Sequence, residues 1–178
     1  MTIELGNKNP PELIYTVDSS GNLLSLEPRE TLHLAKSSKL HAAVIGMLLR
    51  KDDKYLLQWR ASNKLGGNRL DVSATTHIRR GETYESAVQR SFENELRIKD
   101  PVRLEYLFDF IYKEKLGDHN ENEFCKVFLG RYDGKFKPNP IEIDRIEFMT
   151  LQDLKKFITQ DEGKATKWLR ETVSRMEN

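Results

Sequence analysis

Apolar and polar positions alternate along most of the chain, which predicts a protein built mainly from β-strands. Residues 42–49 and 55–60 are apolar runs separated by the charged turn RKDDK, and they predict a hairpin at the centre of a sheet. An earlier hairpin is predicted over residues 12–27, where β-branched and aromatic residues flank a Ser-Gly-Asn turn. Residues 70–75, LDVSAT, form a third run with strand character.

The second half of the chain repeats this alternation over longer segments. Residues 102–113 and 123–133 alternate apolar with polar side chains, as half-buried strands do. We expect a polar loop between them at residues 114–122, EKLGDHNEN, and a last strand at residues 144–150.

Three segments have helical spacing instead. The first follows Thr83, a suitable N-cap, and its apolar residues recur every three or four positions at Tyr84, Ala87, Val88, Phe92 and Leu96. Two closing helices are predicted over residues 150–159, with Thr150 as the cap, and over residues 164–176. Many strands, one internal helix and terminal helices predict an α+β sandwich with a mixed sheet.

Length and charge restrict the class of protein. A chain of 178 residues suits one domain with one core, and a net charge of +1 gives no field to attract nucleic acid or an anionic membrane. The apolar runs are too short to span a bilayer, and the first residues lack the pattern of a secretory signal. We expect a soluble, cytoplasmic protein with neither a nucleic acid nor a membrane as partner. Cys125 is the single cysteine, so no internal disulfide forms.

Histidine and glutamate positions suggest a metal site. His33 and His41 flank the polar loop before the central hairpin, and His77 follows the third strand. Glu121 and Glu123 are two residues apart at the start of a strand, so their side chains point to the same face. Imidazoles and carboxylates together suit a divalent ion such as zinc, manganese or magnesium. Alternatively, these are scattered surface residues.

Basic residues near these histidines suggest an anion site. Arg29, Arg60 and Lys64 lie on predicted loops or strand ends, where a guanidinium fork and an ammonium could bind a diphosphate. Equally, they are ordinary surface charges. Trp168 in the last helix suits a core anchor, although an aromatic face also covers apolar or cationic ligands.

Charged residues also bracket the internal helix. Glu82 and Arg90 precede Glu95, which lies near its C-terminal end, and a solvated charged face is the usual explanation of this pattern. We assign His119 and Cys125 structural roles.

The segment GETYESAVQRSFENELRI, however, resembles the second part of the Nudix box. The matching residues are Glu82, Arg90, Phe92, Glu95 and Ile98. Thr76 and Arg97 replace the first and last glycines of the pattern, and Ser91 and Asn94 replace two of its acidic residues. In Nudix hydrolases the acidic residues of this helix hold magnesium at the diphosphate.

Nearly the whole chain is similar to type I isopentenyl-diphosphate isomerase and its Nudix relatives. The resemblance implies the Nudix fold, an α/β/α sandwich with a mixed sheet, as a single domain over residues 1–178. Its parts would be the hairpin at 12–27, a core at 38–150 and closing helices at 151–176. With a one-residue insertion in the loop 33–41, all five ligands of the isomerase's tightly held metal have counterparts: His33, His41, His77, Glu121 and Glu123.

The same resemblance implies roles for further residues. Glu95 matches a glutamate that helps bind the substrate's magnesium. Arg60 and Lys64 match basic residues that face the diphosphate, and Trp168 matches a tryptophan that shields a carbocation-like centre.

One position departs from the isomerase pattern. Thr75 stands where the isomerase has its catalytic cysteine. A thiol with a pKa of about 8.5 can be tuned to exchange a proton near neutral pH, whereas an alcohol needs a strong adjacent base. Nudix proteins of this branch that lack the cysteine are generally described as hydrolases.

We therefore expect metal-dependent hydrolysis of a diphosphate-containing small molecule, with Glu123 or Glu95 as the general base. Two alternatives remain at this stage. One is an isomerase in which the function of Thr75 is bypassed, and the other is an inert module that binds a diphosphate without turnover.

Overall fold

The computed structural model describes residues 10–34, 36 and 39–177. In these residues the strands are β1 (Leu13–Val17), β2 (Leu23–Pro28), β3 (His41–Leu49), β4 (Tyr55–Arg60), β5 (Leu70–Asp71), β6 (Ala74–His77), β7 (Leu104–Leu116), β8 (His119–Arg131) and β9 (Ile143–Met149). The α-helices are α1 (Arg29–Leu32), α2 (Tyr84–Leu96), α3 (Leu151–Gln160) and α4 (Lys167–Arg175), and a 3-10 turn spans Glu162–Lys164.

Strand β3 is the centre of a mixed sheet. It pairs in parallel with β8, from the His41–Glu123 pair to the Leu49–Arg131 pair. It pairs in antiparallel fashion with β1, β4 and β6. Strand β4 extends the sheet to β5 and β9, and β7 pairs with β8. The predicted mixed sheet is confirmed.

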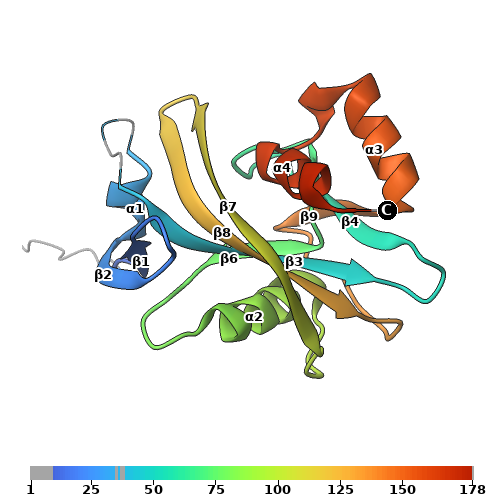
Figure 1. Ribbon diagram of the computed structural model, residues 1–178, viewed down its shortest axis with the longest axis horizontal. Helices are drawn as coiled ribbons and strands as arrows, with labels where there is room; N and C mark the ends of the chain where they lie inside the picture. The colour runs from blue at the N-terminus through green and yellow to red at the C-terminus, as the bar shows by residue number, and fades with distance from the viewer. Residues whose placement is uncertain (1–9, 35, 37–38, 178) are drawn as a thin grey trace, which may run out of the picture.

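Helices cover both faces of this sheet (Figure 1). On β3, Ile45 and Met47 pack in the core under α3 and α4, whereas Val44 and Leu48 pack in the core against α2. Gly46 allows the close approach of α2, because a Cβ atom there would lie 2.6 Å from the ring of Phe92. The predicted α+β sandwich is therefore confirmed, and β3 presents alternate residues to its two layers.

The predicted single strand at residues 70–75 is wrong. It is divided into β5, which pairs with β4, and β6, which pairs with β3. The hydroxyl of Ser73 causes the division: it accepts a hydrogen bond from the amide of Leu48 at 2.7 Å and donates one to the carbonyl of Leu56. The chain thus crosses from one neighbouring strand to the other at this buried serine.

The predicted polar loop at residues 114–122 is also wrong. These residues continue β7 and β8 as far as the Leu116–His119 pair, and the turn consists of Gly117 and Asp118. The backbone of Gly117 has φ +63°, which glycine adopts without strain and which suits a two-residue hairpin turn. Lys115 and His119 near the turn are exposed, whereas Glu121 and Asn122, farther from the turn on β8, are buried. Helix α1 was not predicted.

Two of the three predicted helix starts agree with the structure, whereas the third helix, predicted from residue 164, begins at Lys167 after the 3-10 turn. Thr83 caps α2 by accepting a hydrogen bond from the amide of Ser86, and Thr150 caps α3 in the same way with Asp153. None of the helices in the described part of the chain is both long and apolar enough to cross a membrane. The inferred insertion in the loop 33–41 and the start of the predicted core at 38 involve residues outside those described, as does most of the N-terminal segment examined for a signal pattern.

Candidate metal centre and adjoining pocket

Five side chains from four parts of the fold converge at one end of the sheet. His41 opens β3 directly opposite Glu123 of β8, and Glu121 lies two residues before Glu123 on the same face. His77 closes β6, and His33 follows α1. The possible ligand atoms of the five residues all lie within 4.8 Å of one another. The structure thus brings together all five residues that the resemblance indicated.

Their hydrogen bonds leave donor atoms directed into the cluster. The Nδ1 atoms of His33 and His41 lie 2.7 Å and 3.2 Å from the carbonyl oxygens of Arg29 and Lys39. A proton on each Nδ1 leaves the Nε2 lone pair available to a metal. These two Nε2 atoms and Oε2 of Glu121 are buried without a hydrogen-bond partner in the described structure. This donor set fits a divalent metal ion.

The distances between these groups are those of a compact polar cluster. Nε2 of His33 lies 3.3 Å from Oε2 of Glu121, and Nε2 of His41 lies 3.8 Å from that oxygen and 3.7 Å from Oε1 of Glu123. Nε2 of His77 lies 2.8 Å from Oε1 of Glu123. The buried carboxylates therefore each have imidazoles beside them.

The pKa shifts in the cluster follow from burial and from these pairs. Burial acts to lower the pKa of His41, but the carboxylates of Glu121 and Glu123, 3.8 Å and 3.7 Å from its Nε2, outweigh it and raise that pKa to about 9. Burial acts to raise the pKa of Glu123, but His41 and His77 hold it well below its ordinary value. Both effects favour a cation beside charged carboxylates, and a bound metal ion would take the place of the proton.

Glu123 is fixed by two further residues. The hydroxyl of Tyr112 donates to its Oε2 at 2.7 Å, and the thiol of Cys125 lies 3.5 Å from the same oxygen. Burial raises the pKa of the Cys125 thiol well above its ordinary value, which agrees with the structural role expected for it. The sequence reasoning missed Tyr112, which pairs directly with Glu123 across the β7–β8 hairpin.

Glu95 lies in the last turn of α2, at the other side of the same pocket. Its Oε2 accepts a hydrogen bond from the side-chain amide of Gln58 at 2.7 Å, and its Oε1 accepts one from the amide of Thr75 at 3.3 Å. Burial raises the pKa of Glu95 to about 8. The sequence reasoning missed Gln58, since nothing in the spacing of a strand residue shows that it will meet a helix.

Thr75 occupies the position two residues before His77, on β6. Its hydroxyl donates to the carbonyl oxygen of Val44 at 2.9 Å. The hydroxyl proton is therefore used within the sheet, although Thr75 lines the pocket.

Two of the predicted anion-binding residues, Arg60 at the end of β4 and Lys64 on the loop that follows, are ion-paired. Arg60 lies 2.6 Å from the buried carboxylate of Asp71, and its guanidinium carbon lies 5.3 Å from the centre of the Trp168 ring. Lys64 lies 2.5 Å from Glu142. The sequence reasoning missed both carboxylates.

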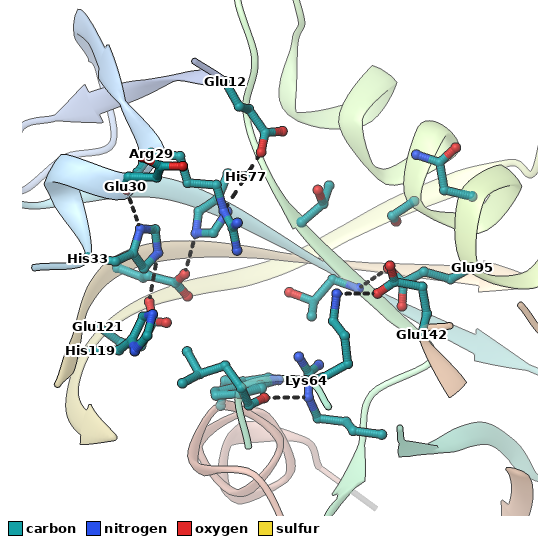
Figure 2. A pocket seen from close by; sticks show the side chains of 18 of the residues that line it. Glu12, Arg29, Glu30, His33, Lys64, His77, Glu95, His119, Glu121 and Glu142 are labelled. Carbon is teal, nitrogen blue, oxygen red and sulfur yellow. Dashed lines mark hydrogen bonds and ion pairs between the residues drawn. The ribbon is translucent and has the colours of Figure 1, made fainter. Parts of the chain in front are cut away.

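Most of these groups line one pocket of about 670 Å³: His33, His77, Glu121 and Glu123 of the cluster, with Thr75, Glu95, Tyr112, Arg60, Lys64 and Trp168. Figure 2 shows His33, His77 and Glu121 gathered on one side of it and Lys64, Glu95 and Glu142 on the other. Arg29 also lines the pocket and is about half exposed, 3.8 Å from Glu12. His119, which we had assigned a structural role, lines the pocket as well.

The helix that carries Glu95 departs from the Nudix box at two acidic positions on its pocket side. Ser91 and Asn94 stand where the Nudix box has acidic residues, and both line the pocket near Glu95. Glu95 is therefore the carboxylate that this helix contributes to the pocket within the described residues.

The other box residues hold the helix in place. Arg90 forms a 2.5 Å ion pair with Glu82 and donates to the carbonyl of His77 at 2.8 Å, which joins α2 to β6. These two side chains are mostly buried, so the expected solvated face is wrong for them. Arg97 ends the helix with φ 58°, the left-handed conformation that the glycine of the pattern would adopt freely.

Comparisons with known proteins agree with this architecture. The NUDIX domain family pattern matches residues 39–169. The chain is 29% identical over 165 residues to isopentenyl-diphosphate Delta-isomerase 1 of Aromatoleum aromaticum, covering 92% of this chain and 91% of that protein. It is 28% identical over 159 residues to the isopentenyl-diphosphate Delta-isomerase of Serratia proteamaculans, covering 88% and 87%.

Solved structures give the same result. DR0079 from Deinococcus radiodurans superposes with a TM-score of 0.76 at 25% identity, over 94% of this chain and all of that one. A MutT NUDIX hydrolase from Burkholderia pseudomallei superposes with a TM-score of 0.62 at 18% identity, over 78% of this chain and 98% of that one. The fold is that of a small α+β protein built around a mixed sheet. The chain belongs to the Nudix family.

Proposed function

We propose that this protein is a metal-dependent hydrolase of a diphosphate-containing small molecule. The observation that carries the proposal is the hydrogen bond made by the hydroxyl of Thr75. This hydroxyl is bonded to a backbone carbonyl, while the candidate ligands for a metal and a diphosphate remain together in one pocket. The site has kept what phosphoryl chemistry needs, and it has no thiol at the position where the isomerase carries one.

The metal would be held by the five-residue cluster: His33, His41, His77, Glu121 and Glu123. When bound, a divalent ion of magnesium, manganese or zinc type supplies a Lewis acid for the phosphoryl oxygens. Family membership supports this, because Nudix enzymes use divalent metals. Glu95 would help to hold a second ion that arrives with the diphosphate.

Protein groups would carry the remaining steps. Water bonds to phosphorus as the bridging P–O bond breaks, and a carboxylate takes the proton of the water. Glu95 suits this role better than Glu123, because it lies outside the five-residue cluster that would hold the first metal and its orientation is fixed by Gln58. Arg60 and Lys64 would offset the charge that develops on the departing phosphate.

Isomerisation of isopentenyl diphosphate is the second candidate. It is favoured by the similarity of this chain, over about nine-tenths of its length, to isopentenyl-diphosphate Delta-isomerases. It would have to bypass Thr75, whose hydroxyl is already bonded to the carbonyl of Val44.

The test is phosphate release from a panel of isopentenyl, dimethylallyl and nucleoside diphosphates, each with magnesium, manganese or zinc. We expect at least one member to be hydrolysed by the wild-type protein. Glu95→Gln should slow that reaction by at least about 100-fold, the usual range for loss of a general base. Release of no phosphate from any member, with heat stabilisation by a diphosphate, would replace the proposal with an inert binding module.

A further inference from the structure

Asp71 is a buried carboxylate that gathers donors from three parts of the fold. It has no exposed surface. It accepts hydrogen bonds from Nη1 of Arg60 at 2.6 Å, from the hydroxyl of Thr166 at 2.9 Å and from the indole N–H of Trp168. The amide of Val72 donates to it at 2.8 Å. A buried carboxylate with a cation and three neutral donors is fully satisfied, and each donor is held in place by it.

The arrangement fixes the guanidinium of Arg60 on more than one side. Nη1 donates to Asp71, Nε donates to the carbonyl of Leu65 at 2.8 Å, and the ring of Trp168 lies under the guanidinium carbon. Neither hydrogen bond uses Nη2, and Arg60 lines the pocket. A guanidinium held in one plane with donors left over is pre-organised to bind an anion, because it loses little freedom when the anion arrives.

The strand register connects this network to the other side of the reaction site. Asp71 pairs with Gln58 on β4, and Arg60 follows Gln58 by two residues on the same strand. The side chain of Gln58 holds Glu95. One short strand pairing therefore sets the positions of both the proposed base and the proposed phosphate-binding arginine.

We propose that Asp71 is a positioning residue, which acts through Arg60 and Trp168 to hold the guanidinium ready for the diphosphate. This inference rests on the proposed function, since it takes Arg60 as a ligand of the substrate's phosphate. Asp71 itself is fully buried and is not among the residues that line the pocket. The sequence alone allows Arg60 to be an ordinary surface charge, whereas in the structure Asp71 holds its guanidinium in one place.

The test measures binding of inorganic pyrophosphate, with magnesium, by calorimetry. Asp71→Asn keeps the shape of the side chain but removes the charge and turns one oxygen into a donor. We expect it to weaken pyrophosphate binding by about 10-fold, the range for a lost hydrogen bond to a charged group. Thr172→Val is the matched control. It removes a buried hydroxyl from α4, the helix that carries Trp168, and this hydroxyl donates to the carbonyl of Trp168. We expect it to bind pyrophosphate within about 2-fold of the wild-type protein.

A double-mutant cycle separates positioning from general damage to the fold. If Asp71 acts through Arg60, Asp71→Asn should change binding by less than about 2-fold in an Arg60→Lys background. Independent effects that multiply would overturn the proposal, as would wild-type binding by the Asp71→Asn protein. Should Asp71→Asn fail to fold, pyrophosphate binding by Arg60→Lys tests the proposal, because a lysine keeps the charge but lacks the guanidinium that donates to both Asp71 and Leu65. Wild-type binding by that variant would also overturn the proposal.

Failure of the proposed hydrolysis can be distinguished from failure of the positioning role of Asp71. A wild-type protein that binds pyrophosphate but hydrolyses none of the diphosphate panel would contradict the proposed hydrolysis, while the coupling between Asp71 and Arg60 would still support the positioning role. A wild-type protein that binds no pyrophosphate would overturn both.

Discussion

The hydroxyl of Thr75 donates a hydrogen bond to the carbonyl oxygen of Val44, 2.9 Å away on the neighbouring strand. The two strands also pair through their backbones at this point, with Thr75 opposite Ile45. The hydroxyl therefore contributes to the sheet, and its proton is not directed at a substrate. This single contact favours hydrolysis over isomerisation.

Thr75→Val removes that hydroxyl at nearly constant shape. We expect the rate of diphosphate hydrolysis to change by less than about 3-fold, because the hydroxyl has no part in the reaction, and the free energy of unfolding to fall by about 1 kcal/mol for the lost hydrogen bond. Steady-state kinetics and urea unfolding measure the two effects. A loss of hydrolysis by two orders of magnitude would show that Thr75 takes part in the chemistry.

Thr75→Cys tests the second candidate function at the same position. We expect no dimethylallyl diphosphate from isopentenyl diphosphate, because the pocket serves another reaction. Appearance of the isomer would instead show that the isomerase machinery is intact apart from the missing thiol.

His77→Ala should remove the bound metal and the activity together. His77 is one of the five clustered groups, and its Nε2 lies 2.8 Å from Glu123. We expect the metal content, measured by elemental analysis of purified protein, to fall by at least 10-fold. His119→Ala is the matched control, because His119 lines the same pocket outside the cluster and should leave the metal content unchanged. Equal metal content in both variants would contradict the assigned site.

The buried Glu95 should make the metal-free protein less stable as the pH rises. Its folded-state pKa of about 8 lies above its value of about 4.3 in the unfolded chain, so between these values the folded state binds more protons. This contribution to stability is complete below pH about 4.3 and is lost as the pH rises through about 8. Glu95→Gln does not titrate and should lose less stability over this window.

Urea unfolding in a chelator at pH 5 and pH 8 measures this effect. We expect the fall in unfolding free energy to be smaller in Glu95→Gln than in the wild-type protein by at least about 1 kcal/mol. Parallel changes in the two proteins would mean that Glu95 is already ionised in the folded state.

Arg97→Gly should stabilise the protein. Arg97 has φ 58°, and a residue with a Cβ in this left-handed region costs roughly 1 kcal/mol more than glycine. We expect a gain of about that size in urea unfolding. Gly81→Ala provides the reverse test, because Gly81 has φ +79° and an added Cβ would meet nothing within 4 Å. It should destabilise by about 1 kcal/mol through backbone strain alone. A neutral Arg97→Gly would show that the arginine side chain compensates for its backbone.

The sequence predicted those features that depend on local periodicity. The α2 helix follows from the spacing of Ala87 and Val88 relative to Phe92, and its start follows from the side chain of Thr83. The strands β3 and β4 follow from two apolar runs. The division of residues 70–75 could not be predicted, because it depends on Ser73 meeting Leu48 and Leu56 from two other strands.

The same limit applies to the site. Residue types alone left a metal site and scattered surface residues both open, and the resemblance decided between them, since the separation of His33 from Glu123 along the chain gives no sign of their contact. The contacts that orient them arise in the folded protein alone. Asp71 reads in the sequence as an ordinary strand residue, and its hydrogen bond with Trp168 joins positions 97 residues apart.

One measurement tests the central claim most directly. The wild-type protein, with magnesium or manganese, is incubated in heavy water with isopentenyl diphosphate and, separately, with each nucleoside diphosphate, while phosphorus and carbon-bound hydrogens are followed by NMR. Hydrolysis predicts phosphate release from at least one of these compounds, with every carbon skeleton unchanged. Formation of the dimethylallyl isomer, or deuterium on carbon in recovered isopentenyl diphosphate, would contradict it and make this protein an isomerase without a thiol at position 75.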